Sequence, residues 1–257
     1  MDAFLDKAKN IDTIEAASAL LWEQIPSPLP ATTKALELSL EAHKEQTRKS
    51  GEPYIVHPIL VAAITAKISN DEMMVQAALL HDVVEDTHYT IEELEREFGY
   101  DVAHMVEGLT KIVEIRDEEL VPSGSDERLI NSALSFRKML IASIKDVRVL
   151  VIKLCDRLHN MLTLDALSVE KQKRIAEETL VVYAPIAHRL GISRLKNHLE
   201  DLSFQYIYYE DYRKIDTYMK SNAQNLKIKL NTFIQNVKEM MDKDGFKENE
   251  FEIIGRV

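Results

Sequence analysis

Residues 81–87 of this chain, His-Asp-Val-Val-Glu-Asp-Thr, place four titratable side chains at the end of an apolar run. If the run is helical, His81 and Glu85 are i,i+4 neighbours, and Asp82 and Asp86 form a second such pair. One imidazole and three carboxylates then share one helix end. Two of these groups can bind a divalent cation while the other two polarise water. The pattern therefore indicates a metal-dependent hydrolase.

A single helical turn cannot surround a cation, so further ligands must come from other elements. Two more polar segments supply candidates: Gly51–Pro58, which contains His57, and Lys153–Asn160, which contains Asp156. The proline after His57 disfavours a helical backbone at that residue, so we expect His57 to be extended at an element junction. Asp156 interrupts an apolar stretch, where a buried and unpaired aspartate is costly.

The elements that must bring these segments together are predicted to be helices. Apolar residues recur with helical spacing over most of the chain, for example over Ile91–Phe98. The β-branched run within Val147–Leu158 is compatible with a strand, but its periodicity favours a buried helix. Breaks are predicted at Pro26–Pro30, at Ser50–Pro53 and in a surface loop at Arg116–Arg128. The predicted fold class is all-α, with no convincing strand before about residue 250.

The amino-acid composition limits the classes of protein to which this chain can belong. An apolar content of 46% with only 7 Gly and 7 Pro suits a compact helical protein. A formal net charge of −11 argues against general affinity for nucleic acid. Cys155 is the only cysteine, which excludes an intramolecular disulfide and fits a reducing cytoplasm. The first residues lack a signal-peptide pattern and no apolar run is long enough to span a membrane, so we expect neither export nor membrane insertion.

In order and spacing, the three polar segments resemble the histidine-aspartate (HD) hydrolase domain of the RelA/SpoT family, the bifunctional synthetase/hydrolases of guanosine tetra- and pentaphosphate (ppGpp and pppGpp). Phe136–Leu140 and Tyr183–Ile192 resemble two further signatures of that family, and the match spans about residues 35 to 215. Such a set is far more specific than a lone His-Asp pair. The resemblance implies the multi-helix HD-domain fold of metal-dependent phosphohydrolases.

The resemblance also implies roles for individual residues. The ligands of one divalent cation, usually manganese in this family, would be His57, His81, Asp82 and Asp156. Glu85 and Asp86 would position and activate the attacking water. The segment that contacts the nucleotide would be Arg48, Lys49 and Ser50, and Asn160 would hydrogen-bond the sugar region. Water would attack the 3′-pyrophosphate group, giving pyrophosphate and GDP or GTP.

We predict three parts: an N-terminal helical segment at 1–31, the HD-type hydrolase domain at 32–205, and linker helices at 206–257 that end in a first strand. Phe251–Arg256 resembles the opening strand of the family's α/β synthetase domain, whose catalytic residues would lie beyond Val257. We therefore expect no synthetase activity and interpret the chain as a fragment of a longer protein.

Two other functions stay open at this point. The same metal site serves nucleotide phosphohydrolases and cyclic-nucleotide phosphodiesterases in related folds, and the products released distinguish these from a pyrophosphohydrolase. A non-catalytic module that senses nucleotide is the third hypothesis, but Glu85 and Asp86 count against it. The expected partner is a guanine nucleotide, without nucleic acid or membrane, and the sequence leaves the oligomeric state undetermined.

Overall fold

The computed structural model describes residues 1–48, 50–118, 146–247, 251 and 253. Its helices are α1 (Asp2–Lys9), α2 (Ile14–Gln24), α3 (Pro30–Ala42), α4 (Val56–Ile68), α5 (Glu72–Leu80), α6 (Val83–Asp86), α7 (Ile91–Phe98), α8 (Tyr100–Glu118), α10 (Val147–Leu162), η1 (Leu164–Ala166), α11 (Val169–Glu178), η2 (Thr179–Tyr183), α12 (Ala184–Arg189), α13 (Ser193–Ile207) and α14 (Tyr209–Lys243). Within the described residues there is no β-strand, only an isolated bridge between Thr47 and Pro53. The predicted all-α class is confirmed.

The backbone contacts divide the chain into two units, 1–207 and 208–257. The first holds all buried residues of the core, and the second consists mainly of α14, which has no buried residue. The predicted division at residues 31 and 205 stays a prediction. The expected strand at Phe251–Arg256 and the signature at Phe136–Leu140 lie largely or wholly outside the described residues.

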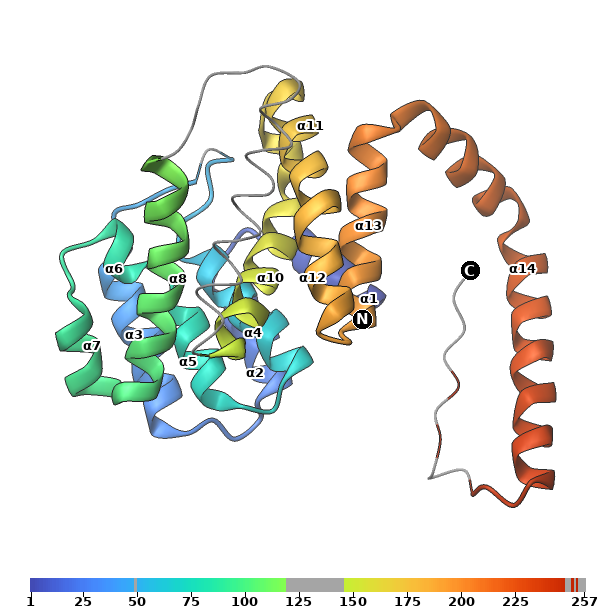
Figure 1. Cartoon of the computed structure of the whole chain (residues 1–257), viewed down its shortest axis with the longest axis horizontal. Coiled ribbons are helices and arrows are strands. Elements are labelled where there is room, and N and C mark those ends of the chain that lie inside the picture. Colours follow the sequence, from blue (N-terminus) through green and yellow to red (C-terminus); the bar gives the residue numbers. More distant parts are fainter. Residues whose placement is uncertain (49, 119–145, 248–250, 252, 254–257) are drawn as a thin grey trace. The chain divides into compact units, whose positions relative to one another are not determined.

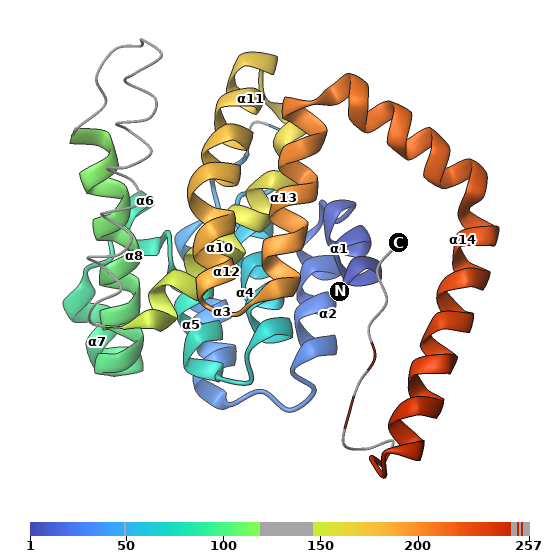
Figure 2. The same cartoon turned by 45° about the vertical axis from the view of Figure 1, so that its right-hand side comes forward.

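Helix α4 lies at the centre of the first unit because its sequence is apolar on every side (Figure 1). Ten consecutive residues, Val56 to Thr65, are buried. Helices α2, α5 and α10 pack against it. Beyond α10, α11 and α12 each pack against α13 (Figure 2). The predicted helix at Ile91–Phe98 is confirmed as α7, and the ambiguous segment Val147–Leu158 is confirmed as helical within α10.

The expectation of an extended His57 is wrong. His57 and Pro58 are the second and third residues of α4. The first turn of a helix does not need the backbone N–H that proline lacks, so Pro58 fits there at little cost. The consequence is that the imidazole of His57 sits at the N-terminal end of the most buried helix.

Arg148 connects the starts of three helices. Its guanidinium is 2.8 Å from Asp146, the N-cap of α10, and 3.4 Å from Asp71, the N-cap of α5. It also lies 3.1 Å from Asp101, in the first turn of α8. Each aspartate is favourable at a helix N-terminus, and one cation offsets their mutual repulsion. This contact fixes the start of α10 relative to the start of α5. Helix α10 carries Asp156, and α5 directly precedes His81.

We expect Arg148→Met to lower the free energy of unfolding by about 1–2 kcal/mol, because three partly shielded carboxylates lose their shared cation. Urea unfolding followed by circular dichroism measures this change. Lys44→Met is the matched control, because Lys44 pairs only with Glu41 on an exposed surface, and it should leave stability unchanged. Equal losses in both variants would contradict the role of Arg148.

Candidate metal centre and adjoining cavity

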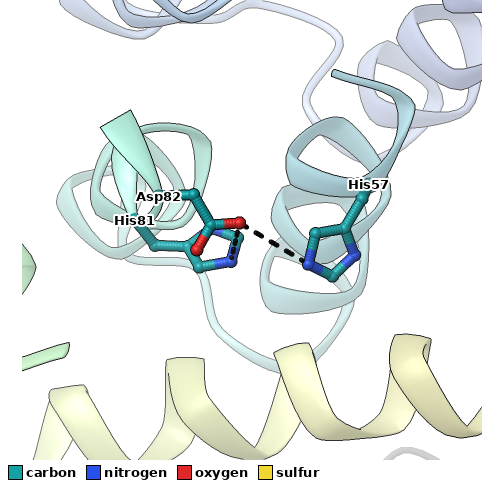
Figure 3. Close-up of side chains that lie close together, drawn as sticks. All are labelled: His57, His81 and Asp82. Carbon is teal, nitrogen blue, oxygen red and sulfur yellow. Dashed lines mark ion pairs between the residues drawn. The ribbon is translucent and has the colours of Figure 1, made fainter. Parts of the chain in front are cut away.

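His81 and Asp82 lie at the junction between α5 and α6. α5 ends at Leu80 and α6 begins at Val83, so the single helix end that the sequence suggested is interrupted, although His81 and Asp82 keep a right-handed helical backbone. The amide of Asp86 still donates to the Asp82 carbonyl at 2.9 Å. The interruption directs His81 and Asp82 toward α4 (Figure 3).

The two nitrogens of His81 have different surroundings. Nδ1 is 2.7 Å from the carbonyl oxygen of Ala78, so it carries a proton and donates it. Nε2 is buried and, among the described residues, has no hydrogen-bond partner, although it lies 3.1 Å from Asp82 Oδ2. A buried imidazole nitrogen with this arrangement is what a metal ligand requires.

His57 reaches the same point from α4. Its Nε2 is 3.8 Å from Asp82 Oδ2 and 3.2 Å from Asp156 Oδ1. Its Nδ1 lies 2.8 Å from Nδ1 of His159, so the opposite edge of the ring is held by a residue of α10. Figure 3 shows the rings of His57 and His81 on either side of the Asp82 carboxylate. The structure thus brings together three of the four predicted ligands.

Asp156 is placed differently from these three. It contacts His57, but it is not part of the group whose donor atoms all lie within 4.8 Å of one another, which is His57, His81 and Asp82. Its Oδ2 accepts from Lys153 Nζ at 2.8 Å and its Oδ1 from Asn160 Nδ2 at 2.6 Å. As the fourth ligand, Asp156 therefore stays a prediction.

The three converging residues fit a divalent cation. Two imidazole nitrogens and one carboxylate oxygen form a donor set that suits first-row divalent metals. Nε2 of His81 is buried and has no hydrogen bond among the described residues, only the charge contact with Asp82, so a cation that displaces its proton can bind there. The group faces a cavity, so further coordination positions are open to solvent or substrate.

The charges of this site are strongly coupled. Burial alone would raise the pKa of Asp82, but the charge of His81 holds it well below its ordinary value. Burial would lower the pKa of His81, yet the charge of Asp82 raises it to about 9. For Asp156, the ammonium of Lys153 outweighs burial and keeps the pKa well below its usual range. Both carboxylates are therefore ionised at neutral pH.

Glu85 behaves in the opposite way. Partial burial, together with the negative charge of Asp82, raises the pKa of Glu85 to about 7. Its side chain lines the cavity, as a group that exchanges a proton with a bound water must. Asp86 is not among the lining residues, and its side chain lies near the hydroxyl of Tyr54. Of the two carboxylates that the sequence grouped as catalytic, the structure thus places Glu85 at the cavity.

The cavity beside these residues has a volume of about 540 Å³ and mixed charge. Its lining includes an acidic group, Asp82, Glu85 and Asp156, beside His57. It also includes a cationic and amide-bearing group, Arg48, Lys153, Arg157 and Asn160. Such a space can accept a ligand that carries both phosphate groups and a polar ring.

Arg48 belongs to the cationic group and is bonded to α10. Its guanidinium donates to Asn160 Oδ1 at 2.9 Å and to Thr163 Oγ1 at 3.3 Å. Asn160 in turn donates to Asp156, so it joins the predicted nucleotide contact to the predicted metal ligand. Ser50 also lines the cavity, and Lys49 lies outside the described residues.

Three contributors to the site were missed by the sequence reasoning. Tyr54 donates to Asp82 Oδ2 at 2.7 Å, Lys153 pairs with Asp156, and His159 holds His57. Lys153 has the i,i+3 spacing to Asp156 that indicates a helical ion pair, and this signal was available. The contacts of Tyr54 and His159 depend on how α4, the α5–α6 junction and α10 cross, and local spacing carries no such information.

Comparisons with known proteins agree with this geometry. Residues 35–193 match the family model described as HD domain. A probable guanosine-3′,5′-bis(diphosphate) 3′-pyrophosphohydrolase of Synechocystis is 43% identical over 91% of this chain and 30% of its own length. The bifunctional (p)ppGpp synthase/hydrolase SpoT of Escherichia coli K12 is 38% identical over 90% of this chain and 32% of its own length. A GTP pyrophosphokinase of Myxococcus xanthus is 50% identical over 71% of this chain and 24% of its own length.

A solved structure is also similar to this chain. It belongs to a metazoan ortholog of SpoT that hydrolyzes ppGpp, with 27% identity and a TM-score of 0.50. This chain covers 96% of that structure, which covers 69% of this chain. By contrast, the chain spans about 30% of the length of the first curated relatives. The family match and these relatives agree: this chain belongs to the HD-domain family and is related to the RelA/SpoT proteins.

Proposed function

We propose that this chain hydrolyses the 3′-pyrophosphate of ppGpp or pppGpp in a metal-dependent reaction. The observation that carries this proposal is the cluster of His57, His81 and Asp82 at the wall of a cavity that also holds Glu85. A ligand cluster alone would suit a structural metal. A carboxylate with a raised pKa beside it, facing open space, suits activation of water.

The relatives support the choice of substrate. Two that align with this chain are named for 3′-pyrophosphohydrolase or (p)ppGpp hydrolase activity. The metazoan ortholog hydrolyzes ppGpp, and this chain covers nearly all of it. Residues 35–193, which match the HD-domain family model, contain the cluster and every residue that lines the cavity, which favours hydrolysis as the function of this segment.

The residues of the chain have distinct roles in the proposed reaction. His57, His81 and Asp82 would hold the cation, with Asp156 as the predicted fourth ligand. When bound, a divalent cation supplies positive charge that stabilises negative charge developing on the phosphoryl oxygens. Glu85 accepts the proton of the attacking water, and its pKa of about 7 suits this task at neutral pH.

The cationic and amide side chains that line the cavity bind the rest of the substrate. Arg48 offers a planar cation that can stack on guanine or bind phosphate, and Lys49 and Ser50 follow it in the predicted nucleotide segment. Asn160 presents an amide to the sugar region. Asp86, which is exposed, is retained as the residue that assists Glu85 in positioning water. The products are pyrophosphate and GDP or GTP.

The proposal also includes the identity of the cation and the cellular location of the activity. We assign manganese as the cation, because nitrogen and carboxylate ligands together suit it and the RelA/SpoT resemblance implies it. We place the activity in the cytoplasm, where a chain with one cysteine stays reduced. Among the helices that the structure describes, none is long and apolar enough to cross a bilayer.

The proposed split between metal ligand and water activation predicts different defects in two variants. Asp82→Asn should weaken Mn²⁺ binding by at least about 10-fold and abolish turnover. Glu85→Gln should keep Mn²⁺ affinity within a factor of about 3 and lower kcat by roughly 10²–10⁴-fold. Calorimetric titration of Mn²⁺ and release of pyrophosphate and GDP from ppGpp measure the two effects. Equal loss of metal in both variants would contradict the split.

The raised pKa of Glu85 predicts a pH dependence. A protonated Glu85 cannot accept a proton, so kcat should fall by up to about tenfold per pH unit below the pKa of Glu85. This pKa is raised to about 7 by burial and the charge of Asp82, and a cation that offsets the charge of Asp82 lowers it. Above this pKa, kcat should level off. The measurement is kcat at saturating ppGpp and Mn²⁺ between about pH 5.5 and 8.5. Glu85→Gln should lack this acidic limb, and an unchanged limb in that variant would assign the titration to another group.

Arg48 should contribute to binding rather than to the chemical step. Arg48→Ala should raise KM for ppGpp by about tenfold and change kcat little, because charged hydrogen bonds and stacking on the nucleotide are lost. Steady-state kinetics at saturating Mn²⁺ test this. Mn²⁺ affinity should be unchanged, since Arg48 contacts no converging ligand. An unchanged KM with the metal site intact would exclude a binding role.

A further inference from the structure

Tyr54 connects the loop before α4 directly to the candidate metal centre. Its hydroxyl donates to Asp82 Oδ2 at 2.7 Å. This is the same oxygen that lies 3.1 Å from His81 Nε2 and 3.8 Å from His57 Nε2. The hydroxyl therefore meets the carboxylate oxygen around which the three ligands converge. Among the described residues, no other neutral donor forms a hydrogen bond with this oxygen.

The backbone of Tyr54 is held on both sides. Its amide donates to the carbonyl of Gln46 at 2.9 Å, and its carbonyl accepts from the amide of His57 at 3.0 Å. The position of the Tyr54 ring is thus tied to the first turn of α4. One residue consequently contacts the backbone of one ligand, His57, and the side chain of another, Asp82.

The loop that carries Tyr54 is itself fixed to α6. The side-chain amide of Gln46 donates through Nε2 to the carbonyl of Asp86 at 3.0 Å, and its Oε1 is 2.7 Å from His43 Nδ1. The buried ring of His43 lies against that of Tyr54, with centroids 5.0 Å apart. Gly51 has φ of +100°, a conformation that favours glycine and lets the loop turn back so that Thr47 pairs with Pro53. The Tyr54 ring is therefore held where its hydroxyl reaches Asp82, with the Asp86 side chain also nearby.

A donor to a metal-binding carboxylate orients it and tunes its basicity. Residues that hydrogen-bond a metal ligand typically affect metal affinity by 10–100-fold. The backbone amides of Gln46 and His57 bond to other groups, so neither takes the place of the Tyr54 hydroxyl as a donor. Together with the contact to His81 Nε2, the Tyr54 hydroxyl orients the Asp82 carboxylate toward both imidazoles.

We propose that Tyr54 is a positioning residue that holds Asp82 for binding of the divalent cation. It touches neither the cation nor the substrate in this role, and it acts through Asp82. The inference rests on the metal requirement of the proposed function, but its primary test needs no substrate.

The test compares two tyrosine-to-phenylalanine variants of the whole chain. Tyr54→Phe removes only the hydroxyl and leaves the ring that packs on His43. Tyr206→Phe is the matched control, because the Tyr206 hydroxyl also donates to an aspartate, Asp165 Oδ1 at 2.9 Å, and neither of those residues lines the cavity. Mn²⁺ is titrated into each protein while the free ion is followed by electron paramagnetic resonance, and circular dichroism verifies folding.

We expect Tyr54→Phe to weaken Mn²⁺ binding by about 10-fold or more and Tyr206→Phe to match the unmodified chain. With ppGpp as substrate, Tyr54→Phe should lose turnover at limiting Mn²⁺ and regain it at saturating Mn²⁺. If Tyr54 were instead a catalytic acid, saturating Mn²⁺ would not restore turnover to the variant.

Equal Mn²⁺ affinity in all three proteins would overturn the inference, and so would a chain that binds no Mn²⁺ at all. Weakened binding in Tyr54→Phe without any turnover of ppGpp by the unmodified chain would support the role of Tyr54 and refute the proposed substrate instead.

Discussion

The fold has to bury several ionisable side chains at the point where α4, the α5–α6 junction and α10 meet. An isolated charge in such a place costs several kcal/mol, so the charges persist only because each faces an opposite one. Asp82 faces His81, and Asp156 faces Lys153, whereas burial lowers the pKa of His57 and leaves its ring neutral. The site is therefore a set of mutually compensating charges within a core of apolar helices. A divalent cation that binds here takes the place of the His81 proton beside carboxylates that are already ionised.

Hydrogen bonds continue outward from this centre. Asp156 accepts from Asn160, Asn160 accepts from Arg48, and Arg48 belongs to the same loop as Tyr54, which returns to Asp82. Hydrogen bonds and this loop thus connect the predicted nucleotide contact to the surroundings of the metal ligands. Arg48 itself bonds to none of the three converging ligands, which is why substitution can separate the nucleotide contact from the metal centre.

The sequence predicted the helices well because burial in this fold follows local periodicity, as Val147–Leu158 and Ile91–Phe98 show. It also placed His57, His81 and Asp82 in one site, which the structure confirms as a cluster. The prediction of an extended His57 was wrong. A proline fits in the first turn of a helix, so Pro58 does not force the preceding residue out of the helix. Tyr54 and His159 could not be found, because their partners come from helices remote in sequence and depend on crossing geometry.

The net charge of −11 appears at odds with a substrate that carries several phosphate groups, and the cavity resolves this conflict locally. Three cationic residues, Arg48, Lys153 and Arg157, line it together with three acidic ones, Asp82, Glu85 and Asp156. Lys153 is engaged by Asp156, and Arg157 by Glu178 and the ring of Tyr183, so neither is fully available to a phosphate. Arg48 alone would leave a polyanion facing excess negative charge. In the proposed function, a divalent cation would therefore have an electrostatic task besides chemistry, because it would offset the charge of the acidic lining residues and let a phosphate approach them.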